Sequence, residues 1–372
     1  MGNRQSTVES LVSHAGFWRG KRVLVTGHTG FKGGWLTLWL NSLGADVTGL
    51  ALQPATQPNL FFEAGLAGDC TSRIVDVRDA HAVAEVVRVA SPEIAFHLAA
   101  QPLVRASYDE PAATWMTNVM GTIALLDALR RTNTARAIVV VTSDKCYEQS
   151  AATGVFREGD ALGGHDPYSS SKAAAEIATA SWRRSFFDAA PGGMTTGVAT
   201  ARAGNVIGGG DWSADRLIPD LVRGAMKGSS VPIRYPRATR PWQHVLDPVR
   251  GYLMLAERLA HEPRRYGGAW NFGPEAEGSI PVADVAERFA KALDRGARWH
   301  VAEDASLHEA ATLALDSTKA REDLGWRPRW TIAEAIARTA DAYRVALDRG
   351  DFRTAMLDQI AAHRASLEVE AA

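Results

Sequence analysis

Residues 143–145 place a hydroxyl, a carboxyl and an amine side by side, as Ser143, Asp144 and Lys145. They come directly after a run of strand-forming residues at 137–141. In an open sheet of parallel strands, ligands bind in the crevice beyond the carboxyl ends of the strands. We therefore expect these three side chains to line such a crevice, where they could exchange protons with a bound molecule.

A second segment, at 166–172, supplies a tyrosine and a lysine on one helical face. Pro167 is typical of a first helical position, and Tyr168 and Lys172 stand four residues apart. A lysine held near a tyrosine stabilises the phenolate and lowers the pKa of the tyrosine, which makes it a usable base near neutral pH. Such a pair is common by chance, so its meaning depends on what precedes it in the chain.

A glycine-rich turn near the start of the chain provides that context. Gly27, Gly30 and Gly33 lie at three-residue spacing between an apolar strand at 21–25 and an apolar helix, and a second strand follows at 47–51. Glycine lets the backbone approach a pyrophosphate, which then sits on the helix N-terminus. This order of strand, turn, helix and strand is the context that a dinucleotide-binding fingerprint requires.

The expected cofactor is NAD rather than NADP. The second strand ends near Gln53 instead of the acidic residue that usually holds the ribose hydroxyls, and no arginine there is placed for a 2′-phosphate. Asp76, after a third strand, can accept a hydrogen bond from the adenine amino group or cap the next helix, and Asp79 suits capping better. The residues expected around the cofactor are Gly27, Gly30, Phe31, Lys32, Gly33, Asp76, Val77, Leu98, Ala99, Ala100, Asn118, Tyr168 and Lys172.

Strands and helices alternate from residue 22 to residue 202, which predicts an α/β fold with a doubly wound parallel sheet of the Rossmann type. Glycine-rich loops follow, and then amphipathic helices at 282–293 and 332–347, which indicate a smaller mixed α/β lobe. The expected domains are an NAD-binding domain at 18–203 with about 239–262, a nucleotide-sugar lobe at 204–238 and 263–350, and terminal extensions at 1–17 and 351–372.

Composition excludes several classes of function. A formal net charge of -1 gives no basic surface for nucleic acid. Two cysteines are too few for a disulfide framework and fit a reducing compartment. No segment has the hydrophobic core of a signal peptide or the ~18 apolar residues of a membrane helix, and no residues have metal-ligand spacing. We expect a cytoplasmic protein without a metal that binds neither nucleic acid nor a membrane.

Arginines gather in the second half of the chain at Arg234, Arg237 and Arg240. They could form a solvated face, but their neighbours Tyr235, Trp242 and Trp270 favour a stacking surface. Guanidinium forks next to aromatic rings suit a nucleoside diphosphate.

Together these motifs resemble the extended short-chain dehydrogenases that act on nucleotide sugars, and most of all their CDP-glucose 4,6-dehydratase branch. The resemblance covers nearly the whole chain and is carried by residues 26–33, 97–105, 142–147, 202–212, 240–245 and 270–274. It implies a lyase of deoxysugar biosynthesis, of the kind that supplies the O-antigen of lipopolysaccharide, with NAD as cofactor and CDP-glucose as substrate. It also implies a homodimer in which helices at about 111–131 and 168–187 form a four-helix bundle with those of a second copy. The apolar residues available there are Ile123, Ala124, Ile177 and Ala178, which could equally face their own sheet.

The reaction that the resemblance implies is a redox-neutral dehydration. Tyr168 takes the proton of the sugar 4-hydroxyl while hydride leaves C4 for NAD, Ser143 hydrogen-bonds the 4-oxygen, and Asp144 protonates the departing C6 hydroxyl before hydride returns to C6. Relatives that act on dTDP-glucose or GDP-mannose carry a glutamate after this aspartate as the base for the C5 proton, whereas this chain has Lys145. Lysine acts as a base only where its surroundings lower its pKa, so Lys145 either abstracts the proton or orients a water that does. The substrate contacts carried over are Gln101, Arg105, Arg202, Asn205, Leu217, Ile218, Pro219, Arg234, Arg240 and Asn271.

Three competing functions differ from this one in what they need. A nucleotide-sugar 4-epimerase shares Tyr168 and Lys172 but performs no elimination, so it needs no ionisable groups at Asp144 and Lys145. A net reductase needs exchangeable NADPH, against which the missing arginine argues. A non-catalytic sensor or scaffold would be expected to lose Tyr168, Lys172 or Asp144, and all three are present. The alternative is therefore another NAD-dependent nucleotide-sugar enzyme, such as a 4-epimerase or a dehydratase of a different NDP-hexose.

Overall fold

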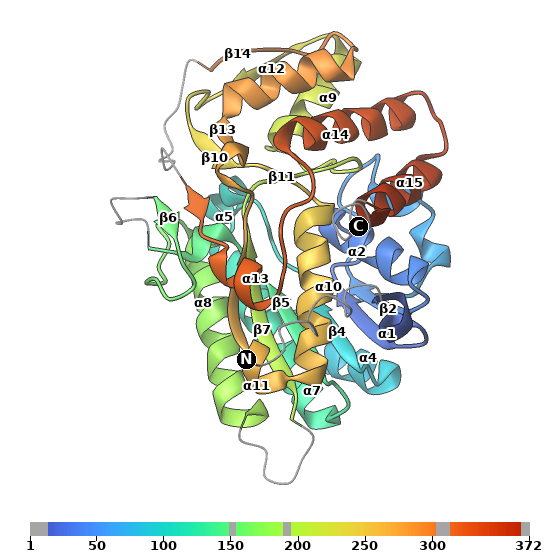
Figure 1. Cartoon of the computed structure of the whole chain (residues 1–372), viewed down its shortest axis with the longest axis vertical. Coiled ribbons are helices and arrows are strands. Elements are labelled where there is room, and N and C mark those ends of the chain that lie inside the picture. Colours follow the sequence, from blue (N-terminus) through green and yellow to red (C-terminus); the bar gives the residue numbers. More distant parts are fainter. Residues whose placement is uncertain (1–13, 149–153, 189–194, 303–312, 366–372) are drawn as a thin grey trace, which may run out of the picture.

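The central layer of the molecule is a seven-stranded parallel sheet, seen in a computed structural model that describes residues 14–148, 154–188, 195–302 and 313–365 (Figure 1). The strands run in the order β12-β7-β5-β4-β1-β2-β3, and every neighbouring pair is parallel. Their bounds are β1 (Arg22–Thr26), β2 (Asp46–Ala51), β3 (Thr71–Ile74), β4 (Ile94–His97), β5 (Ala137–Val141), β7 (Gly197–Ala203) and β12 (Gly268–Phe272). The chain switches direction across the sheet between β1 and β4, which is where open α/β sheets bind ligands. The predicted doubly wound α/β fold is confirmed.

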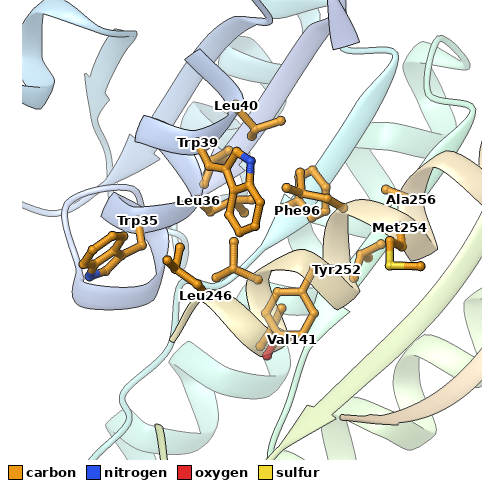
Figure 2. Packing of buried hydrophobic residues seen from close by; sticks show 14 of the residues in the cluster. Trp35, Leu36, Trp39, Leu40, Phe96, Val141, Leu246, Tyr252, Met254 and Ala256 are labelled. Atoms are coloured by element: carbon orange, nitrogen blue, oxygen red, sulfur yellow. The ribbon is translucent and has the colours of Figure 1, made fainter. Parts of the chain in front are cut away.

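Helices cover both faces of the sheet, and alternate strand residues point to opposite faces. Phe96 in β4 belongs to a buried cluster with α2 (Phe31–Ser42) and α10 (Leu246–His261), whereas its neighbour Ala95 belongs to one with α4 (Ala80–Ala90) and α7 (Gly121–Thr132). Figure 2 shows Trp39 of α2 and Tyr252 of α10 on the first face, beside Phe96 and Val141. Burial on both faces explains why residues 137–141 are apolar without interruption.

A second lobe packs around α9 (Leu217–Lys227), α12 (Val282–Leu293) and α14 (Ile332–Leu347), which lie together at the top of Figure 1. Its buried cluster includes Trp212, Trp242, Phe289 and Tyr343. The bounds of α12 and α14 agree with the predicted helices at 282–293 and 332–347, which are confirmed. Thr331 and Glu334 form a capping box that fixes the start of α14.

Short elements complete the described fold. Four two-stranded pairs lie outside the main sheet: β6 (Val155–Phe156) with β15 (Ala314–Leu315), β8 (Val206–Ile207) with β11 (Gln243–His244), β9 (Ser230–Ile233) with β14 (Arg298–Val301), and β10 (Thr239–Pro241) with β13 (Ser279–Pro281). The other helices and turns are α1 (His14–Trp18), α3 (Leu60–Glu63), η2 (Leu66–Gly68), α5 (Val104–Asp109), α6 (Pro111–Trp115), η3 (Met116–Met120), η4 (Asp144–Cys146), α8 (Pro167–Trp182), η5 (Arg183–Phe187), α11 (Pro263–Tyr266), η6 (Ala276–Gly278), α13 (Thr318–Asp323) and α15 (Phe352–Ala365).

Two segments belong to the main body rather than to the parts assigned from sequence. Strand β12 is the edge strand of the central sheet, although residues 263–350 were assigned to the second lobe. Helix α15, in the expected C-terminal extension, packs against α2 and α14 and buries Phe352, Met356 and Ile360. Residues 1–13 and 366–372 of the expected extensions lie outside the described part of the chain.

Candidate active site

A cavity of about 890 Å³ opens beyond the carboxyl ends of β1, β4, β5 and β7, between the sheet and the second lobe. Ser143, Asp144, Lys145, Tyr168 and Lys172 all line it. The glycine turn and the start of α9 line the same cavity. The fold therefore brings the two segments that carry chemistry together with the expected cofactor and substrate regions.

The glycine turn has a tight backbone. Gly27 has a φ of +78°, and a Cβ there would lie 2.8 Å from the backbone nitrogen of Ala99. A Cβ on Gly33 would lie 2.0 Å from the carbonyl oxygen of Gly27. Side chains are therefore excluded at both positions. Gly27, Gly30, Phe31, Lys32 and Gly33 all line the cavity, so the N-terminal end of α2 presents backbone amides and its positive dipole end to a ligand.

Asp76 and Val77, which were expected near the adenine, line the cavity after β3. Arg78 donates hydrogen bonds to both carboxylate oxygens of Asp76, the shortest at 2.5 Å, and this pairing lowers the pKa of Asp76. Asp79 caps α4, as expected, by accepting from two backbone amides. Gln53 lines the same end of the cavity.

The turn after β4 lines the cavity with Leu98, Ala99 and Ala100, whereas Asn118 lies behind it. The Asn118 amide accepts from the backbone nitrogen of Gln101 at 2.8 Å and donates to the hydroxyl of Ser171 in α8 at 2.9 Å. Asn118 therefore braces this turn against α8 instead of lining the cofactor region.

The segment at 143–145 begins where β5 ends. The hydroxyl of Ser143 accepts a hydrogen bond from the backbone nitrogen of Lys145 and donates one to Oδ1 of Asp144, both at 3.1 Å. Burial raises the pKa of Asp144, although the positive charge of Lys145 opposes this shift. The carboxyl thus keeps its proton to a higher pH than an ordinary aspartic acid, which suits a general acid. Lys145 itself is half-buried.

Tyr168 is held in the first turn of α8. Asp166 caps this helix, its carboxylate accepting from the backbone nitrogen of Ser169 at 2.9 Å. Burial raises the pKa of Tyr168, and a hydrogen bond with Ser143 opposes that shift. Lys172 was expected to lower the pKa of Tyr168. In the structure this pKa is raised instead, because burial outweighs the charges around the phenol.

Lys172, Lys32 and Arg216 add positive charge at this end of the cavity. Burial lowers the pKa of Lys172 to about 8, and its ammonium donates to the carbonyl of Val141 at 3.3 Å. Burial and the charge of Arg216 lower the pKa of Lys32 to about 8, whereas Asp144 raises it. Lys32 therefore interacts electrostatically with Asp144 in the catalytic segment, in addition to its place in the glycine turn. Arg216 was not predicted from the sequence, since a lone arginine before a helix carries no spacing signal.

The part of the cavity next to the second lobe contains most of the expected substrate residues. Arg105 lines it while pairing with Asp215 at 3.0 Å, and Gln101 lines it while donating to the hydroxyl of Thr114 at 2.9 Å. The other expected residues that line the cavity are Asn205, Leu217, Ile218, Pro219, Arg234 and Arg240, together with Tyr235 and Trp242. Arg237 does not line it, and neither does Trp270, which is buried in the core and so forms no part of the expected stacking surface.

Arg202 and Asn271, which the resemblance implied as substrate contacts, do not line the cavity. Arg202 is 3% exposed, and its guanidinium pairs with Glu176 at 2.7 Å and donates to the hydroxyl of Tyr147 at 2.7 Å. Asn271 is fully buried and accepts from the same hydroxyl at 2.7 Å. Both side chains form hydrogen bonds within a buried network behind the catalytic segment.

In the described ranges, no three His, Cys, Asp or Glu side chains are grouped so that they could hold a metal ion. No helix of that part is long and apolar enough to cross a membrane. Cys70 and Cys146 are free thiols.

Comparison with known proteins agrees with this geometry. The family model described as GDP-mannose 4,6 dehydratase matches residues 24–339. The chain is 46% identical over 323 residues to the CDP-glucose 4,6-dehydratase of Salmonella typhimurium, covering 87% of this chain and 90% of that protein.

Solved structures show the same architecture. MoeE5 in complex with UDP-glucose and NAD is 26% identical with a TM-score of 0.72, over 88% of this chain and 100% of that one. DesIV, a dTDP-glucose 4,6-dehydratase from Streptomyces venezuelae with NAD and TYD bound, has a TM-score of 0.74 over 88% of this chain and 98% of that one; at 24% identity it shows the fold alone. On the family match and the identity to the Salmonella enzyme, the chain belongs to the GDP-mannose 4,6-dehydratase family.

Proposed function

We propose that this protein is an NAD-dependent CDP-glucose 4,6-dehydratase, which converts CDP-D-glucose to CDP-4-keto-6-deoxy-D-glucose and water. The observation that carries the proposal is the meeting of Asp144, Lys145 and Tyr168 in one cavity. An oxidation needs the tyrosine, but only an elimination also needs an acid and a second proton acceptor beside it. The 46% identity to the Salmonella enzyme supports CDP-glucose over other NDP-hexoses.

The lining residues divide the proton transfers among them. Tyr168 accepts the proton of the sugar 4-hydroxyl, and Ser143 hydrogen-bonds the 4-oxygen. Asp144, whose pKa burial raises, donates its proton to the departing C6 hydroxyl. Lys145 lines the cavity next to this acid and receives the C5 proton, directly or through a water that it orients.

The cofactor region fits NAD. The backbone of the glycine turn would hold the pyrophosphate at the start of α2, and Asp76 and Gln53 would lie toward the adenosine. When bound there, NAD would supply a reversible acceptor for the hydride that moves from C4 to C6. The positive charge of Lys172 supports the phenolate form of Tyr168 during the first proton transfer.

The nucleotide-sugar region carries the positive charge that a diphosphate needs. Arg216, Arg234 and Arg240 line it from the second lobe, and Tyr235 and Trp242 give it aromatic walls. Arginine beside an aromatic face suits both the phosphates and a stacked base.

The test is to incubate the purified protein with CDP-glucose and NAD and to measure the mass of the product. We expect loss of one water and a carbonyl at C4. A 4-epimerase would return an isomer of unchanged mass. Parallel reactions with dTDP-glucose, UDP-glucose and GDP-mannose report base preference. Absence of dehydration with every one of these substrates would contradict the proposal.

We also propose that the enzyme is a homodimer. Large apolar side chains are exposed on the outer face of the helices at 111–132 and 167–187, namely Trp115, Met116, Met120, Ile177 and Phe186. Of the residues considered from sequence, Ile177 is 58% exposed whereas Ala178 is buried. A second copy packing its own two helices on this face would cover the patch as a four-helix bundle.

A cytoplasmic location and a role in deoxysugar biosynthesis, such as that of the O-antigen, belong to the same proposal. The free thiols of Cys70 and Cys146 support a reducing compartment.

A further inference from the structure

A buried carboxylate lies directly behind the catalytic segment. Glu176 follows Lys172 by one turn of α8, and its side chain is 3% exposed. Its Oε1 accepts a short hydrogen bond from the hydroxyl of Thr142, and its Oε2 accepts from the hydroxyl of Thr200 at 2.7 Å. The guanidinium of Arg202 donates to the same Oε2 at 2.7 Å. Three donors on two oxygens match the acceptor-only character of an ionised carboxylate.

These contacts tie the catalytic helix to the sheet. Thr142 comes between the last residue of β5 and Ser143, and Thr200 lies in β7. Glu176 is in α8, which also carries Tyr168 and Lys172. One side chain therefore fixes the helix that holds the base against the strand end that holds the acid.

The network continues to the other end of the catalytic segment. Arg202 donates to the hydroxyl of Tyr147 at 2.7 Å, and this hydroxyl donates to Oδ1 of Asn271 at 2.7 Å. The amide of Asn271 donates to the carbonyls of Phe156 and Asp316, at 3.0 and 3.2 Å. The residues at 142 and 147, on either side of the acid, are thus both held by one buried chain of charge-assisted hydrogen bonds.

Glu176 also acts electrostatically on Lys172. Burial lowers the pKa of Lys172, and Glu176 is the strongest group that opposes this shift, followed by Cys146. On the other elements around it, Lys32 in α2 and His97 in β4 are the groups coupled to Lys172. Burial lowers the pKa of His97 to about 3, so His97 adds no positive charge near neutral pH. Glu176 is therefore the carboxylate that favours the charged form of this lysine.

We propose that Glu176, paired with Arg202, is a positioning residue of the dehydratase: it holds Thr142, and with it the catalytic segment, in register with Tyr168 and Lys172. This rests on the roles proposed above for Tyr168 and Lys172. It differs from an ordinary buried ion pair, which would contribute only to folding and could be replaced by apolar residues without loss of chemistry.

The experiment compares Glu176→Gln/Arg202→Met, which removes both buried charges together, with Arg353→Met. The latter breaks the Arg353–Asp69 pair (2.6 Å), whose residues do not line the cavity, and controls for lost stability. Folding is checked by circular dichroism and Tm, and kcat, KM for CDP-glucose and the pH–rate profile are then measured. In the double variant we expect kcat to fall by about 10- to 100-fold, less than the ~10²–10⁴-fold expected for loss of the base itself, with KM nearly unchanged. The alkaline limb for C4 oxidation, followed as NADH formation in a single turnover, should move to lower pH, because Lys172 loses its proton more readily without the carboxylate.

A folded double variant with the kcat and pH profile of the wild type would overturn the proposal. If the double variant does not fold, Glu176→Asp is used instead, because it keeps both charges but withdraws the carboxylate by one methylene. A lower kcat with an unmoved alkaline limb then supports the positioning role of Glu176. An unchanged kcat overturns that role. Tyr168→Phe is measured in parallel. If Tyr168→Phe is fully active, the assignment of the base fails, which is a separate result from failure of the role of Glu176.

Discussion

Replacing Asp144 by asparagine should separate the two halves of the proposed reaction. Asp144 is 4% exposed, its Oδ1 accepts from Ser143 at 3.1 Å, and its Oδ2 has no hydrogen-bond partner among the described residues. Asparagine keeps the volume and the Ser143 contact but has no dissociable proton. Oxidation at C4 by way of Tyr168 should continue, while loss of water slows by about 10²–10⁴-fold, the usual contribution of a general acid. Folding should not suffer, because an ionised carboxylate is disfavoured at this buried position.

The assay follows NADH absorbance and product mass in deuterated water. In Asp144→Asn we expect NADH to accumulate, or the C5 proton to exchange with solvent without dehydration. For the wild type, the proton donation to the C6 hydroxyl should decline as pH rises through the raised pKa of Asp144, since the acid must be protonated. Asp215→Asn removes another carboxylate that lines the cavity and should still dehydrate. Elimination at the wild-type rate in Asp144→Asn would show that a different group is the acid.

Three further predictions concern the base, the cofactor and the assembly. Tyr168→Phe should lose about 10²–10⁴-fold in C4 oxidation with an unchanged Tm, and near wild-type NADH formation in a single turnover would reassign the base. Because Gln53 offers the ribose no carboxylate, whose charge-assisted bonds contribute ~1.5–3 kcal/mol each, purified protein should be partly empty and gain activity with added NAD. Gln53→Asp should tighten NAD in a titration of nucleotide-free protein; full occupancy as purified would argue against this. Ile177→Asp should give a monomer by light scattering, whereas Met226→Asp, at an exposed residue of α9, should not; a persistent dimer would refute the proposed interface.

Local signals in the sequence were enough for much of this fold and site. The helix α12 has an uninterrupted amphipathic pattern, so its bounds could be read directly. The glycine turn could be recognised because its backbone requires glycine: a Cβ on Gly33 would lie 2.0 Å from the carbonyl oxygen of Gly27. Tyr168 and Asp144 were found because their neighbours in sequence carry them to the same end of the sheet.

Arg202 and Asn271 show where such reasoning stops. An arginine after a parallel strand can face a phosphate or a buried carboxylate, and nothing local to Arg202 distinguishes the two. Its partner Glu176 lies 26 residues earlier in the chain. It stands among small residues in α8, which give no sign in the sequence of a buried ion pair. Arg216 was missed for the converse reason, since its place in the cavity follows from how α9 packs rather than from spacing. The partners of a charged side chain are set by long-range packing, which one sequence does not display.

The docking of α15 bears on how the chain completes its fold during synthesis. His363 in α15 pairs with the buried Asp247 at the start of α10 at 2.9 Å, and its ring contacts that of Trp39 in α2 with centroids 5.6 Å apart. Helix α2, which begins at the glycine turn, is therefore covered only after a segment more than 300 residues later in the chain has been synthesised. The edge of the sheet is likewise completed only when β12 has been made. Contacts of such sequence separation form late and leave apolar surface exposed meanwhile. A ribosome-bound chain that stops before residue 352 should leave Trp39 uncovered and depend on chaperones, so expression tags belong beyond α15 and not in its place.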